Sequence, residues 1–75
     1  MKDRVLEILH LIRPDVDFEK EEGLLSNEIL DSFDFIQIIA MLSEEFGIEI
    51  APMDVCVDNF DNLNSILKMI QKNRE

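Results

Sequence analysis

The chain has 75 residues, of which 47% are hydrophobic, and its 17 acidic residues against 7 basic ones give a net charge of −10. This hydrophobic content suits one small core, so we expect a single domain over residues 1–75 rather than a wholly disordered chain. So acidic a surface repels phosphate backbones and anionic membranes, which disfavours nucleic-acid and membrane partners and favours basic protein surfaces.

Three features indicate a soluble cytoplasmic protein. The only cysteine, Cys56, permits no internal disulfide, so nothing indicates secretion. The first residues, Met1-Lys2-Asp3-Arg4, lack the charged-then-apolar order of a signal peptide. The longest uninterrupted apolar run covers residues 38–42, which is far too short to cross a bilayer.

The first predicted element is a helix over residues 3–13. Its apolar residues recur at intervals of three and four, with Leu6 and Leu11 widening the stripe on either side; the stripe itself is Val5, Ile8, Leu9 and Ile12. Pro14 ends the helix because the residue before a proline avoids the helical conformation.

Residues 14–31 form a long connection, and long ordered loops in small domains are often functional. Its apolar side chains would pin it to the core; they are Val16, Phe18, Leu24, Leu25, Ile29 and Leu30. We therefore expect a fixed loop rather than a flexible linker.

Residues 32–46 form the longest predicted helix, which Gly47 ends in a left-handed cap position. One face is apolar and belongs to the core: Phe35, Ile38, Ile39, Leu42 and Phe46. The opposite face, which we call the outward stripe, is Phe33, Gln37, Ala40, Met41 and Glu44. Apolar residues on an outward stripe suggest a docking surface, although single exposed apolar residues are also ordinary.

Residues 48–50 form a short extended link, and Pro52 suits the first turn of a short third helix over residues 53–57. Residues 58–62 form a turn, and residues 63–73 form the last helix, with four inward residues: Leu63, Ile66, Leu67 and Ile70. The prediction is an all-α protein, a small four-helix bundle of three longer helices and one short third helix.

Catalytic and metal sites find little support in the sequence. His10 is the only histidine and has no cysteine nearby, so neither a zinc site nor a hydrolytic triad is present; a surface or half-buried histidine is expected. Cys56 is expected to be a small buried hydrophobe. The acidic segments lack the spacing and glycine of a calcium loop, so we expect no metal ligands, and no glycine-rich phosphate loop exists.

The junction Asp31-Ser32 remains the most distinctive site. Asp31 or Ser32 can cap the following helix, and Asp34 is a first-turn acid that favours the helix dipole. Ser32 is therefore either a plain cap or a serine that is modified, because a phosphate ester at a helix start is stabilised by free N–H groups. These physical arguments leave both interpretations open.

Asp31-Ser32-Phe33 resembles the attachment motif of the acyl carrier protein family. The approach through residues 25–31, the helix and link over 34–50, and the segment 61–70 are similar to that family too, so the resemblance covers essentially the whole chain. It implies the family's four-helix fold.

The resemblance implies that Ser32 carries a covalent 4′-phosphopantetheine arm, which a phosphopantetheinyl transferase takes from coenzyme A with magnesium. Acyl or aminoacyl groups would then be held as thioesters on the thiol of the arm, and Asp31 would help present the serine. The protein would be a monomeric, non-catalytic carrier whose outward stripe binds partner enzymes: Phe33, Gln37, Ala40, Met41 and Glu44.

Several alternatives remain open from the sequence. Gln37 and Ser43 stand where the fatty-acid-synthesis pattern often has acids, and Phe33 looks closer to the D-alanyl carrier proteins of teichoic acid modification. Fatty acid, polyketide and related biosynthetic pathways are all compatible, and the acyl chain is hypothesised to fold back near Ile39, Leu42 and Val55. The rival class is a helical interaction module that never carries the arm.

Overall fold

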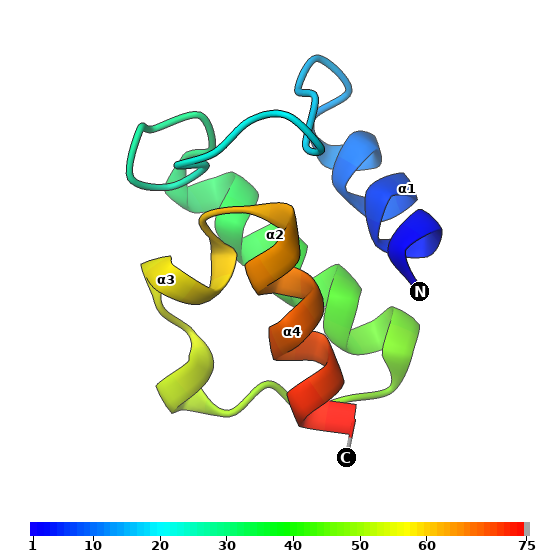
Figure 1. The fold of residues 1–75 in the computed structure, drawn as a ribbon. Helices are drawn as coiled ribbons and strands as arrows, with labels where there is room; N and C mark the ends of the chain where they lie inside the picture. Colours follow the sequence, from blue (N-terminus) through cyan, green and yellow to red (C-terminus); the bar gives the residue numbers. More distant parts are fainter. Residues whose placement is uncertain (75) are drawn as a thin grey trace.

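The computed structural model describes residues 1–74, and these contain four α-helices and one short 3₁₀ turn, without a β-strand. In chain order they are α1 (Lys2–Ile12), α2 (Ser32–Phe46), η1 (Pro52–Asp54), α3 (Val57–Phe60) and α4 (Leu63–Arg74) (Figure 1). The prediction of an all-α fold with three longer helices and one short one is confirmed.

Helix α1 places its predicted stripe in the core. Val5, Ile8 and Leu9 are buried, and the helix ends at Ile12, ahead of Pro14. Leu11 does not widen this stripe as expected, because 74% of it is exposed to solvent. The buried side of α1 is therefore narrow, and one large apolar side chain remains on the surface.

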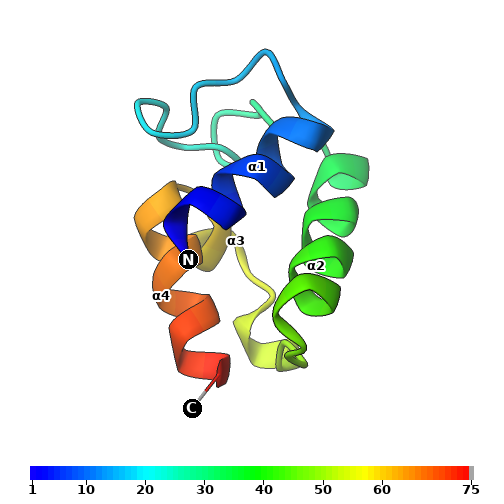
Figure 2. The same ribbon diagram turned by 90° about the vertical axis from the view of Figure 1, so that its right-hand side faces the viewer.

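Helix α2 begins and ends where the sequence predicted. Ile38 and Leu42 are fully buried on its inner side. Gly47 has the expected left-handed conformation, with φ of 59°, and its N–H donates to the carbonyl of Ser43. Figure 2 shows α2 and α4 on opposite sides of the molecule, with α1 passing between their upper ends.

The long loop between α1 and α2 is fixed to the core, as expected. Four of its apolar residues are buried: Val16, Phe18, Leu24 and Leu30. Its backbone is also bonded, because the N–H of Leu24 donates to the carbonyl of Asp61 at 2.8 Å. The loop segment at Leu24 is thus held against the junction between α3 and α4.

The predicted third helix over residues 53–57 is wrong in its position. Pro52 does start a turn, but the chain becomes extended at Cys56 and the helix α3 begins only at Val57. The turn ends at Asp54, whose carbonyl accepts from the N–H of Cys56 at 3.0 Å and from the Asn59 side-chain amide at 2.8 Å. The carboxylate of Asp54 is buried and bonded to the Lys72 ammonium of α4 at 2.9 Å. Cys56 is exposed, which corrects the expectation of a buried cysteine.

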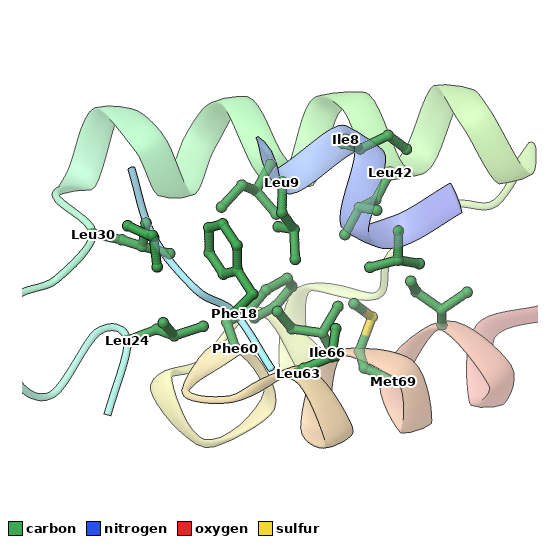
Figure 3. Packing of buried hydrophobic residues seen from close by; sticks show 14 of the residues in the cluster. Ile8, Leu9, Phe18, Leu24, Leu30, Leu42, Phe60, Leu63, Ile66 and Met69 are labelled. Carbon is green, nitrogen blue, oxygen red and sulfur yellow. The ribbon is translucent and has the colours of Figure 1, made fainter. Parts of the chain in front are cut away.

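The core lies between α2 on one side and α3 with α4 on the other (Figure 3). Phe35 and Phe60 meet edge to face with ring centroids 5.0 Å apart, a favourable aromatic arrangement. The ends of the described chain are close, since the Arg74 guanidinium lies 3.8 Å from the Met1 sulfur. In residues 1–74 no helix combines the length and apolar character that crossing a membrane requires.

Candidate functional site

The start of α2 is closed by a reciprocal pair of hydrogen bonds. The carboxylate of Asp31 accepts from the N–H of Asp34 at 2.8 Å, and the carboxylate of Asp34 accepts from the N–H of Asp31 at 3.4 Å. Such a capping box satisfies two otherwise free backbone donors. Of the two residues expected to cap the helix, Asp31 is the cap, and Ser32 is the first helical residue.

Ser32 is exposed at this helix start. Within residues 1–74 its hydroxyl has no hydrogen-bond partner, so the oxygen is free to be modified. The backbone N–H groups of the first turn and the helix dipole favour an anion attached here. A phosphodiester on Ser32 therefore fits the local charge and hydrogen-bonding pattern.

An open groove of about 460 Å³ runs beside Ser32 and is lined by residues of the loop, α2 and α3. Its lining is Leu25, Glu28, Leu30, Asp31, Ser32, Phe35 and Val57. We call it the attachment groove. The residues near which a folded-back acyl chain was hypothesised, Ile39, Leu42 and Val55, are not part of it.

Glu28 gives the loop its sharp turn just before Ser32. Its φ is 58°, in the left-handed region that side chains other than glycine, asparagine and aspartate rarely adopt. After this turn Leu30 points into the core and its N–H donates to the carbonyl of Leu24 at 2.8 Å. The loop therefore returns on itself and delivers Asp31 to the start of α2.

Arg13 connects three segments around Ser32. Its Nη1 donates to the Asp34 carboxylate and to the Ile29 carbonyl, both at 2.9 Å. Its other nitrogens donate to the Asp15 carboxylate at 3.1 Å, which lowers the pKa of Asp15. The role of Arg13 could not be predicted from the sequence, because Ile29 and Asp34 lie 16 and 21 positions further along the chain.

Asp61 is a second residue that sequence reasoning missed. Its carboxylate accepts from the N–H groups of Leu25 and Ser26 and from the Ser26 hydroxyl, each at 2.9 Å. The N–H groups of Ser26 and Leu25 and that hydroxyl hold the pKa of Asp61 below its usual value. Asp61 thereby anchors the loop wall of the attachment groove to the α3–α4 junction.

The outward stripe is partly as predicted. Phe33 is 67% exposed, and Ala40 and Glu44 are exposed as well. Gln37 and Met41 are half-buried, and Met41 packs against the core. Ile36 is 64% exposed and was missed, although its position one turn after Ser32 could have suggested it.

His10 is exposed, as one of the expected alternatives had it. Its Nε2 lies 3.2 Å from the carbonyl of Val16, and its ring lies 5.5 Å from that of Phe18. In the part of the chain that the structure describes, no three acidic, histidine or cysteine side chains gather as metal ligands would.

Comparison with known proteins identifies the family. The family model described as a phosphopantetheine attachment site matches residues 1–70. The chain belongs to this family. Its prosthetic group is therefore a covalently attached 4′-phosphopantetheine, and the protein is a non-catalytic carrier of the acyl carrier type.

Among curated proteins, a D-alanyl carrier protein from Abiotrophia defectiva is 28% identical over 79 residues, which cover 96% of this chain and 94% of the relative. No solved structure matches the chain.

Proposed function

We propose that Ser32 is the residue that carries the arm. The observation that supports this most directly is the exposed, unpartnered hydroxyl at the start of α2, held next to an open groove by the capping box of Asp31 and Asp34. When attached, the arm supplies a thiol on which an acyl or aminoacyl group is held as a thioester. Asp31 presents the serine to the transferase by fixing the backbone immediately before it.

The cargo that we favour is a small aminoacyl group, as the name of the Abiotrophia defectiva relative suggests. Support also comes from α2, where the large apolar residues Phe33 and Ile36 are exposed, so that its outward side is less acidic than the net charge of −10 suggests. Carriage of fatty acid or polyketide intermediates is the second candidate, because the same thioester serves all three. The loading and using enzymes are the proposed partners, and we expect a monomer in the cytoplasm.

Modification is tested by intact mass. The purified chain is incubated with coenzyme A, magnesium and a broad-specificity phosphopantetheinyl transferase, and Ser32→Ala is the control. We expect one phosphopantetheine on the wild type and none on the variant. Because Ser32 is exposed and is not the cap, the substitution should change the free energy of unfolding by less than about 0.5 kcal/mol. No mass gain on folded wild type, with more than one transferase, would favour the interaction module.

The cargo is tested on the modified chain. Loading is measured once with an ATP-dependent ligase that activates D-alanine and once with an acyltransferase of fatty acid synthesis. Faster loading by the ligase supports the aminoacyl proposal, and loading by the acyltransferase alone contradicts it.

Partner docking is tested by replacing exposed apolar residues one at a time. Phe33→Ser and Ile36→Ser should each slow loading roughly tenfold, as removal of an interface contact of about 1.4 kcal/mol does. Met53→Ser is the matched control, because Met53 is 80% exposed but lies on η1, away from α2 in the sequence. Equal loading by all three variants would remove Phe33 and Ile36 from the docking surface.

A further inference from the structure

A single nitrogen of Arg13 holds the chain on both sides of Ser32. Nη1 donates to the carbonyl of Ile29, three residues before Ser32, and to the carboxylate of Asp34, two residues after it, both at 2.9 Å. Ser32 has no side-chain bond of its own within residues 1–74. The position of its hydroxyl is therefore set by these flanking residues.

The carboxylate of Asp34 depends on Arg13 for its orientation. Asp34 is only 8% exposed, and the oxygen that accepts from the Asp31 N–H at 3.4 Å is the same Oδ2 that accepts from Arg13. A buried carboxylate that loses its cation is destabilised and turns toward water. Without Arg13 the half of the capping box that restrains the Asp31 backbone would be lost.

We infer that Arg13 is a positioning residue for the modification of Ser32. Its guanidinium joins the end of α1, the end of the loop and the first turn of α2, and so fixes the backbone that presents the hydroxyl. This inference rests on the proposed function, because it assumes that Ser32 is the residue modified. It assigns Arg13 no contact with the reacting atoms.

Arg4 provides a matched control near the other end of α1, since Arg13 directly follows that helix. Its Nη1 and Nη2 pair with Glu7 at 2.7 Å and with Glu45 at 2.8 Å, so it also joins α1 to α2, but at the end of α2 far from Ser32. Arg4→Gln and Arg13→Gln each remove one cation that links the same two helices. Only the second should disturb residues 29–35.

The first readout is amide hydrogen exchange in the unmodified chain, which does not require modification. Arg13→Gln should speed exchange at residues 31–35 at least roughly tenfold over wild type, while Arg4→Gln leaves these amides unchanged. The second readout is transfer kinetics at a temperature well below both melting transitions. Arg13→Gln should raise KM for the carrier roughly tenfold with a smaller effect on kcat, because fewer molecules hold the competent conformation.

Two further variants separate positioning from general stability. Arg13→Lys keeps the charge but not the planar fork, so it should restore only part of the lost kcat/KM. Arg13→Gln combined with Asp34→Asn leaves no buried unpaired charge. The fold-loss of kcat/KM in this double variant should therefore be smaller than the product of the fold-losses in the two single variants.

The outcomes distinguish the two proposals. No transfer to folded wild type overturns both the role of Ser32 and the inference about Arg13. Normal transfer to wild type, with exchange and KM the same in Arg13→Gln as in Arg4→Gln, overturns only the inference about Arg13.

Discussion

The two ends of α2 are held in different ways. At the Ser32 end, Asp31 and Asp34 form the capping box, and Arg13 holds Asp34 from outside the helix. At the other end Gly47 adopts a left-handed conformation and bonds back to Ser43. Within residues 1–74, the ion pair that joins α1 to that end is Arg4–Glu45, whose side chains are 51% and 32% exposed.

This difference indicates what each end does. The glycine end stops the helix by local backbone geometry, and its exposed ion pair contributes little to stability. The serine end uses hydrogen bonds from α1, from the loop and from α2 itself, and these restrict the backbone around one unbonded hydroxyl. Restricting a reactive group in this way lowers the entropy lost when a partner enzyme engages it.

The largest expected difference in the free energy of unfolding is between two phenylalanines, Phe60 near the serine end of α2 and Phe46 at its other end. Phe60→Ala should lower the free energy of unfolding by about 3–5 kcal/mol, because the fully buried ring packs against Phe35 near the serine end. Phe46→Ala should lower it by only about 1–2 kcal/mol, because Phe46 is half-buried beneath the Arg74 guanidinium. Urea denaturation measures both, and equal losses would contradict the distinction.

The next pair of variants removes the residue that caps each end of α2. Asp31→Ala should cost about 0.5–2 kcal/mol as a lost cap, and Gly47→Ala about 1–2 kcal/mol as a strained left-handed residue. Their stabilities should be similar, but only Asp31→Ala should slow arm transfer to Ser32. The test is the rate of arm transfer, measured under conditions in which both variants are folded. Slow transfer to Gly47→Ala would show that modification of Ser32 depends on both ends of α2.

Lowering the pH should destabilise the loop that leads to Ser32 more than it destabilises the end of α2 near Gly47. Backbone N–H groups lower the pKa of Asp61 when the chain is folded, and Arg4 lowers that of Glu45. A folded-state pKa below the unfolded value of about 4 means that this stabilisation is present above about pH 4 and is lost as pH falls through the folded pKa.

The urea midpoint, compared between pH 7 and pH 3, measures this loss. Asp61→Asn should lose less stability on acidification than wild type does, and Glu45→Gln should change the pH dependence less. Asp61 accepts three hydrogen bonds from the loop, whereas the Arg4–Glu45 pair is exposed. If Glu45→Gln had the larger effect, the loop would not be the acid-sensitive part.

The smallest expected effect concerns the left-handed residue on the serine side. Glu28→Gly should raise the free energy of unfolding by up to about 1 kcal/mol, because relief of the left-handed conformation exceeds the entropy that glycine loses on folding. Thermal melting measures this change. The melting temperature of Gly47→Ala, measured for comparison, should shift in the opposite direction. A destabilised Glu28→Gly would indicate that the carboxylate makes a stabilising contact.

How far the sequence predicts the fold depends on how local each interaction is. Both ends of α2 could be placed because Asp31 and Gly47 act within one turn of themselves. The third helix was misplaced because the backbone leaves the helical conformation at Val55 and Cys56, beside the buried Asp54, whose partner Lys72 lies 18 positions further along the chain. Periodicity has no information on such contacts.

The candidate site divides in the same way. Ser32 and Asp31 belong to a contiguous motif, so the sequence identified them. Arg13 and Asp61 were missed because they act on residues 21 and 36 positions away, and only the folded loop brings them there. Ile36 was missed because it lies beside the outward stripe rather than within it.

The most direct test of the account is to locate the arm on the chain, which has four serines at positions 26, 32, 43 and 65. The modified protein is cleaved after glutamate, and the peptide covering residues 29–44, which contains Ser32 and Ser43, is fragmented in a mass spectrometer. We predict that the whole added mass lies on fragments that contain Ser32, at the N-terminal end of α2. Added mass on Ser43, or on a peptide that contains Ser26 or Ser65, would contradict it.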